Sequence, residues 1–266
     1  MHRLDTMHEL KQRLIGALLA ILAAVVPARP ASAGPCSFES QGEGHVAAII
    51  DGKSFRLTDG REIVLAGIAP PADAENGNRS AALAAILAGQ DVILRGQDDA
   101  PDRYGRQSAF VFLTPGEILV QELLLSQGGA LASADVAERD CAGLFAGAEA
   151  EARQGKKGLW AEPTAIKNAE IADDILTGIG RFVVVEGRVL SVRQAGATTY
   201  LNFGRNWTRG FTVTISRRAL PAIEAAGIAL KSLENRRVRV RGWVEARPAP
   251  RIDVQRAAQI EILGDN

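Results

Sequence analysis

The chain has 266 residues, and this length predicts one or two domains. Apolar residues make up 47% of the sequence, too many for a disordered chain. The 31 basic and 31 acidic residues balance overall, but residues 34–160 carry 11 basic and 18 acidic side chains whereas residues 181–266 carry 15 and 7. This asymmetry indicates that the two halves meet different partners, and a nucleic-acid role would suit the basic second half better.

Residues 1–33 have the pattern of an export signal. A positively charged stretch precedes the apolar run from Leu14 to Val26, and Ala31-Ser32-Ala33 fits a cleavage site. The run is too short for a comfortable membrane span. We therefore expect a cleaved signal peptide and a periplasmic or secreted protein with no transmembrane span. An uncleaved N-terminal anchor is the alternative.

The mature chain would keep two cysteines, Cys36 and Cys141. An even pair in an oxidising compartment suggests a disulfide, which would tie the N-terminus to the start of a late helix. Two unrelated thiols are the alternative.

A β-hairpin is predicted between Ile49 and Ala72. Asp59-Gly60 is a strong two-residue turn signal, and the second strand runs from Glu62 to Ile68. Pro70-Pro71 then ends regular pairing.

The chain from there to residue 160 alternates helices and strands. We expect helices at Arg79–Leu87, Ile118–Gln127 and Ala142–Gln154, and strands at Asp91–Arg95 and Arg106–Leu113. This order fits a small five-stranded barrel with helices packed on it.

Three motifs in this region resemble the thermonuclease (staphylococcal-nuclease-like) family. Residues 50–72 follow the family's first motif, residues 102–106 read Asp-Arg-Tyr-Gly-Arg, and residues 158–160 read Gly-Leu-Trp after a helix. The resemblance covers residues 45–160. It implies a barrel of the oligonucleotide/oligosaccharide-binding (OB) type over the domain at residues 34–160.

The resemblance also implies a phosphodiester-hydrolysing site with one calcium ion, two Asp ligands, one Glu and two Arg. The Asp positions fall on Lys53 and Ala69, the Glu position on Ala72, and the Arg positions on Val64 and Arg106. Only Arg106 keeps the family's residue. Calcium requires oxygen ligands, and the general base and one phosphate-binding charge are missing as well. We therefore expect an inactive nuclease homologue with no metal and no cofactor.

Two further hypotheses concern this site. The loop acids Asp73 and Glu75 offer, with Arg106, a route to an active non-standard nuclease. Alternatively, the Lys53 ammonium takes the place of the cation and forms a weak anion site with Arg106. The opposing interpretation of Lys53 is a side chain that points to solvent.

Residues 161–180 are predicted to be a linker and residues 181–266 a second OB-like barrel. Its strands are expected at Phe182–Val192, Thr199–Phe203, Gly210–Ile215, Arg237–Val244, Arg251–Val254 and Ala258–Leu263, with a helix at Arg217–Ala226. The predicted fold class is thus mainly β with α, built from two OB-type five-stranded barrels.

One strand of the second block carries a basic stripe. Arg237, Arg239, Arg241 and Trp243 occupy alternate positions and would share one face of a strand. Cations and aromatic rings on a barrel suit single-stranded nucleic acid or a nucleotide. A solvated arginine face is the alternative.

Together these features predict an exported, non-catalytic nuclease homologue that binds nucleic acid or a protein partner. The alternatives are the non-standard nuclease and a structural envelope module that acts through interactions alone.

Overall fold

The computed structural model describes residues 36, 38–71, 76–206 and 208–264. The predicted export signal and its cleavage site lie outside these residues. Residues 35–266 form one compact unit. Within the described part of the chain, no helix combines the length and the apolar character needed to cross a membrane.

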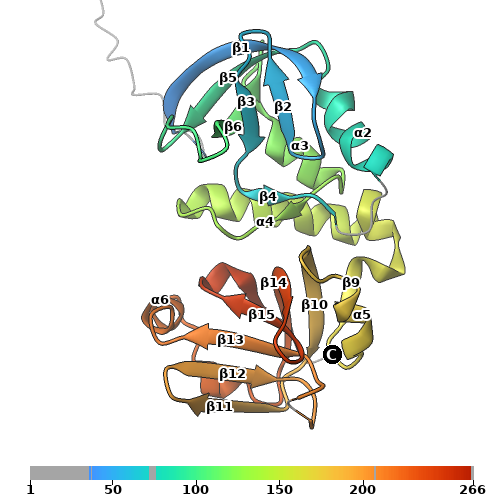
Figure 1. The fold of residues 1–266 in the computed structure, drawn as a ribbon, viewed down its shortest axis with the longest axis vertical. Coiled ribbons are helices and arrows are strands. Elements are labelled where there is room, and N and C mark those ends of the chain that lie inside the picture. Colours follow the sequence, from blue (N-terminus) through green and yellow to red (C-terminus); the bar gives the residue numbers. More distant parts are fainter. Residues whose placement is uncertain (1–35, 37, 72–75, 207, 265–266) are drawn as a thin grey trace, which may run out of the picture. The chain divides into compact units, whose positions relative to one another are not determined.

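The first half contains a closed five-stranded barrel (Figure 1). Its ladders run in the order β3-β2-β1-β5-β6, and a parallel pairing of β3 with β6 closes the circle. The strands are β1 (Glu39–Ile49), β2 (Ser54–Leu57), β3 (Glu62–Leu65), β5 (Asp91–Gly96) and β6 (Arg106–Leu113), with β7 (Ile118–Leu119) paired to β6.

The predicted hairpin is β2–β3, and its turn has the expected chemistry. Gly60 has φ +91°, a backbone conformation that favours glycine. Asp59 Oδ1 accepts a hydrogen bond from the Arg61 amide at 3.0 Å, which stabilises the turn. Alternation along β3 places Ile63 and Leu65 in the barrel core.

Three helices accompany the barrel: α2 (Asn76–Leu87), α3 (Val120–Ser126) and α4 (Arg139–Gln154). Helix α4 begins three residues before the predicted start at Ala142. The Glu138 carboxylate caps it by accepting hydrogen bonds from the amides of Asp140 at 2.8 Å and Cys141 at 2.6 Å. Glutamate is an uncommon capping residue, so the sequence pattern predicted that the helix would begin three residues too far along the chain.

The predicted disulfide is confirmed. Cys36 and Cys141 are bonded, are both fully buried, and are separated by 105 residues of sequence. The bond joins the segment before β1 to the first turn of α4, next to the barrel core.

The second half is an eight-stranded sheet in which the ladder order is β11-β12-β13-β15-β14-β10-β9, with β16 paired to β14. Its hydrogen-bonded ladders do not close into a second barrel, so the structure shows a mixed α+β chain with one closed barrel. The strands are β9 (Ile166–Asn168), β10 (Phe182–Arg188), β11 (Ser191–Ala195), β12 (Thr198–Asn202), β13 (Thr212–Ser216), β14 (Arg237–Ala246), β15 (Pro250–Val254) and β16 (Ile260–Ile262). The α-helix α6 (Leu220–Ala225) and the short 3-10 helices η3 (Leu230–Leu233) and η4 (Ala257–Gln259) lie between them in sequence.

Two features of this half depend on local packing. Residues 161–180, expected to be a linker, contain the short helices η2 (Pro163–Ala165) and α5 (Ala172–Leu176) and the strand β9, which pairs in parallel with β10. Glycine is needed at position 187 of β10 for close packing, because a Cβ there would lie 2.4 Å from the Ala169 Cβ.

A buried apolar cluster connects the barrel region with the second sheet. It unites two short paired strands, β4 (Ile68–Ala69) and β8 (Leu131–Ala132), with α4, the 3-10 helix η1 (Gly158–Ala161) and β10. Its members are Ala69, Leu131, Ala152, Trp160, Phe182 and Val184.

Candidate functional site

The candidate site lies on the outer face of β2, β3 and β6. Residue pairing across these strands places Glu62 between Arg56 and Arg106, and Val64 between Ser54 and Ser108. Because Ile63 and Leu65 point into the core, Glu62 and Val64 point outward. Val64, where the family has an arginine, therefore leaves an uncharged position in the middle of this face.

Arg106 begins β6 and is held by an acid from its own turn. Its Nη2 and Nε donate to Asp102 Oδ2 at 2.8 and 3.1 Å. The other Asp102 oxygen accepts from the Tyr104 and Arg106 amides at 2.8 and 3.0 Å. These bonds, above all that from the Arg106 side chain, lower the pKa of Asp102 to about 2 and raise the pKa of Arg106. A phosphate that approached Arg106 would have to compete with Asp102.

Lys53 lies in the turn between β1 and β2. Its amide donates to Asp51 Oδ1 at 2.8 Å, and its carbonyl accepts from the Leu65 amide at 2.8 Å. Arg106 is the cross-strand neighbour of Glu62, which precedes Leu65 by three residues. Arg106 therefore lies along the other edge of β3 from Lys53. Strand geometry then separates the Lys53 and Arg106 backbones by roughly 10 Å along β3 and roughly 10 Å across it. One phosphate can touch both cations only if both side chains extend toward it.

Ala69 stands in β4, paired with Leu131 of β8, and is only 2% exposed. It belongs to the apolar cluster that includes Phe182 and Val184 of β10. The position where the family has a metal-binding carboxylate thus lies in a buried apolar contact with the second sheet. A carboxylate would be costly here because the surrounding cluster is apolar and burial would remove the charge from water.

The residues present do not fit a calcium site. Position 53 carries an ammonium group and position 69 a methyl group. Across the described ranges, no group of three His, Cys, Asp or Glu side chains is arranged to hold a metal ion. Ala72, Asp73 and Glu75 lie outside the described residues.

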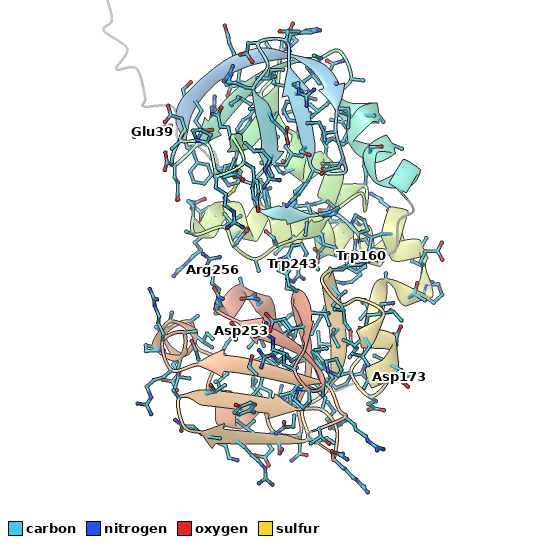
Figure 2. All side chains as sticks on the ribbon, in the orientation of Figure 1. Glu39, Trp160, Asp173, Trp243, Asp253 and Arg256 are labelled. Atoms are coloured by element: carbon cyan, nitrogen blue, oxygen red, sulfur yellow. A yellow bond between two sulfur atoms is a disulfide. The ribbon has the colours of Figure 1, made fainter. Side chains whose placement is uncertain are left out.

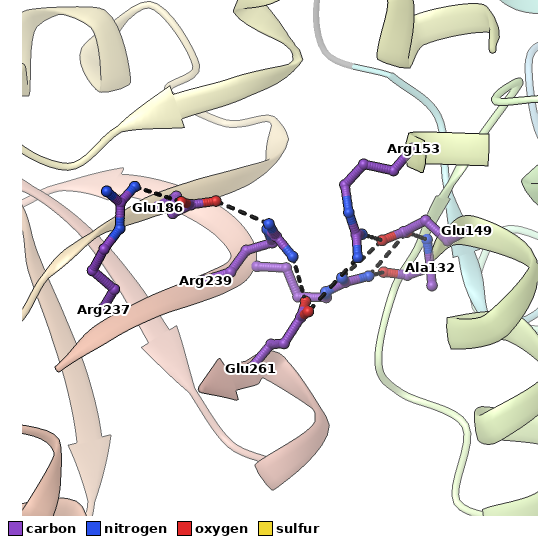
Figure 3. Close-up of polar contacts among 8 residues, drawn as sticks. Ala132, Glu149, Arg153, Glu186, Arg237, Arg239 and Glu261 are labelled. Atoms are coloured by element: carbon purple, nitrogen blue, oxygen red, sulfur yellow. Dashed lines mark hydrogen bonds and ion pairs between the residues drawn. The ribbon is translucent and has the colours of Figure 1, made fainter. Parts of the chain in front are cut away.

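The basic stripe of β14 lies on one face, as predicted, but each of its arginines is paired with an acid (Figure 3). Arg237 and Arg239 both bind Glu186, at 2.6 and 2.9 Å, and Arg239 also binds Glu261 at 2.8 Å. Arg241 is buried, at 8% exposure. The expected array of open cations is therefore largely neutralised within the protein.

Arg241 reaches from the second sheet to helix α4. Its Nη1 and Nη2 donate to the two carboxylate oxygens of Glu149 at 2.9 and 2.8 Å, and Nη1 also donates to the Ala132 carbonyl at 3.0 Å. Glu149, which is 1% exposed, accepts a further bond from the Ala132 amide at 2.6 Å. Sequence reasoning missed this pair, because a glutamate in an Ala- and Glu-rich helix resembles a solvated surface residue.

Trp243, the last member of the stripe, remains open. It projects from β14 with 55% of its surface exposed (Figure 2), and its ring meets Phe182 edge-on at 6.0 Å between centroids. Together with Arg237, whose side chain is 48% exposed, it is the part of the stripe that an external ligand can reach.

Residues 62–162 match the family described as Staphylococcal nuclease homologue. No curated protein matches the chain. The family match begins at the first residue of β3 and extends beyond η1, so it contains the Asp102–Arg106 turn, α4 and the Gly-Leu-Trp motif. It confirms the resemblance seen in the sequence: residues 62–162 form a domain of the staphylococcal nuclease homologue family.

Proposed function

We propose that the chain is an exported nuclease homologue that does not hydrolyse phosphodiesters and acts as a binding protein for single-stranded nucleic acid or nucleotides. The observation that carries the proposal is Ala69. Its burial among Phe182 and Val184 means that a metal-ligand position of the family serves here to pack the second sheet against the domain.

The remaining substitutions remove the other catalytic contributions. Lys53 would repel a calcium ion, and Val64 cannot neutralise a phosphate. A general base typically accelerates a reaction about 10²- to 10⁴-fold, and one hydrogen-bond donor that stabilises the transition state about 10²- to 10³-fold. The loss of the metal, a base and one of two arginines leaves no efficient route to hydrolysis.

Two features support retained binding. Lys53 and Arg106 supply positive charge near the face where the family binds phosphate. Arg237 and Trp243, at opposite ends of the stripe on β14, supply an exposed cation and an exposed aromatic ring. We further propose that the second sheet is an OB-like barrel, with β10 and β11 as one bent strand. The pairing order supports this proposal. If β10 and β11 count as one strand, the order β11-β12-β13-β15-β14-β10 matches the order β1-β2-β3-β6-β5 of the first barrel. In both orders the third pairing is parallel, β13 with β15 in the second sheet and β3 with β6 in the first barrel.

Export is supported by the buried disulfide, which is typical of proteins in oxidising compartments. N-terminal sequencing of the native protein tests this part of the proposal. We expect the mature chain to start at Gly34, and a chain that still carries the residues before Leu14 would contradict cleavage.

The test of function is an assay of the purified protein on labelled single-stranded DNA and RNA, with and without calcium, reading binding and cleavage together. We expect salt-dependent binding without cleavage. Cleavage that is lost in both Arg106→Gln and Asp73→Asn would establish the non-standard nuclease. Absence of binding at low salt would favour a protein partner or a structural envelope module.

A further inference from the structure

Two arginines of the second sheet face each other directly across a strand pair. Arg188 of β10 is the cross-strand partner of Arg237 of β14. Like charges at directly opposed positions destabilise a sheet unless a counter-charge compensates them. Glu186 binds Arg237, but it is shared with Arg239, and the hydrogen bond of Arg188 Nη1, at 2.7 Å, goes to the uncharged carbonyl of Asn235.

These two arginines line an open pocket of about 500 Å³ between β9, β10 and β14. This volume lies in the usual range for small-molecule sites, roughly 300–1,000 Å³. Lys167, Asn168, Glu170 and Glu186 also line it. Two arginines and two acids thus line the pocket, and Glu186 is already bound by the guanidinium groups of Arg237 and Arg239. Lys167 is only 5% exposed, and its Nζ is bound to Asp174 at 3.1 Å.

We propose that this pocket binds a small phosphorylated, hydroxyl-bearing molecule, with its phosphate between the guanidinium groups of Arg188 and Arg237. A phosphate dianion has enough oxygens for two planar guanidinium groups and removes the repulsion between them. Asn168 at the end of β9 and Glu170 just after it supply an amide and a carboxylate as partners for hydroxyl groups.

The same lining argues against a polynucleotide as the occupant. Glu170 and Glu186 would repel a continuous run of phosphates, whereas a single phosphate can bind between the arginines alone. The pocket uses neither Lys53 nor Arg106, but it shares Arg237 with the surface proposed above for nucleic acid. The amides of Gly187 and Arg188 report on the pocket itself, so its occupancy is measured separately from nucleic-acid binding elsewhere on the protein.

The experiment is an NMR titration of the purified protein at constant ionic strength, following the amides of Gly187 and Arg188. The probes are inorganic phosphate, ribose 5-phosphate, ribose and succinate. We expect saturable shifts with phosphate, tighter binding of ribose 5-phosphate, and no saturation with ribose or succinate. Arg188→Gln and Arg237→Gln should each weaken phosphate binding about tenfold or more, because each removes charge-assisted hydrogen bonds.

Arg193→Gln, at an exposed arginine of β11 in the same sheet, is the matched control and should leave binding unchanged. Arg237→Lys keeps the charge that faces Glu186 but lacks the planar fork, and it serves if Arg237→Gln unfolds; it should weaken binding less than the glutamine variant. Four results would overturn the proposal: no saturable shift with phosphate, equal binding of succinate, equal loss in Arg193→Gln, or saturable shifts of the Gly187 and Arg188 amides with oligonucleotides that bind more tightly as they lengthen.

Discussion

Arg241 of strand β14 and Glu149 of helix α4 form a bidentate ion pair, with 2.9 and 2.8 Å between their nitrogen and oxygen atoms, although 92 residues separate them in sequence. Both side chains are almost fully buried. A buried charge that loses its partner is strongly destabilising, whereas an intact pair need not add net stability. The pair therefore couples the stability of the domain at residues 62–162 to that of the second sheet.

Arg241→Met should lower the free energy of unfolding by about 3–5 kcal/mol, because it leaves the Glu149 carboxylate buried without its main partner. Urea unfolding measures the change. The matched control is Arg251→Met, which breaks the exposed pair with Glu245 and should cost less than about 1 kcal/mol. Adding Glu149→Leu to Arg241→Met should recover part of the loss, and a double variant as unstable as the sum of both single changes would contradict the coupling.

Ala69→Asp should fail to restore a metal site and should destabilise the protein by roughly 3 kcal/mol or more, since the carboxylate would enter the apolar cluster. Thermal unfolding with and without calcium measures both effects. Ala85→Asp, at an exposed position of α2, is the control and should cost less than about 1 kcal/mol. A fully stable Ala69→Asp protein that binds calcium would show that position 69 remains open to a metal.

The Asp102–Arg106 pair predicts a specific pH dependence. The pKa of Asp102 is lowered from 3.8 to about 2 in the folded protein, so its stabilising contribution is present above pH 3.8 and is lost as the pH falls through about 2. Asp102→Asn should therefore flatten the pH dependence of the unfolding free energy in this window. If the wild-type and Asp102→Asn curves remain parallel as the pH falls from 3.8 to about 2, the pair contributes nothing to stability.

The disulfide should stabilise the first barrel through its long loop. Cys36 and Cys141 are 105 residues apart, and the chain-entropy model gives about 4–5 kcal/mol for a loop of this length. Reduction, or Cys36→Ser with Cys141→Ser, should lower the melting temperature. Thiol titration of the denatured, non-reduced protein should find no free cysteine, and two titrating thiols would exclude the bond in solution.

The parts of the fold that depend on local chemistry could be predicted from the sequence. Asp59-Gly60 specifies the β2–β3 turn, and the valines between the arginines specify the inward face of β14. The residue at which α4 begins could not be predicted, because Glu138 replaces the usual N-capping residues. The break at Val189-Leu190, which separates β10 from β11, carries no glycine or proline signal.

The sequence predicted which residues occupy the candidate site but not which other parts of the chain surround them. The motifs identify Lys53, Val64, Ala69 and Arg106, but nothing local to Ala69 shows that β10 covers it. The charge pattern of β14 identifies a shared face for Arg237, Arg239 and Arg241 and leaves their partners unknown. Glu149, Glu186 and Glu261 reach that face from three distant segments, and such contacts follow from tertiary packing rather than from sequence spacing.

The central claim is that packing has replaced the family's metal chemistry in this domain. The most direct measurement is the effect of millimolar calcium on the melting temperature and on cleavage of labelled single-stranded DNA in the same samples of the purified protein. We predict an unchanged melting temperature and no cleavage, because Lys53 and the buried Ala69 provide no carboxylate for the ion. Calcium-dependent cleavage, accompanied by a calcium-dependent rise in melting temperature, would contradict the account.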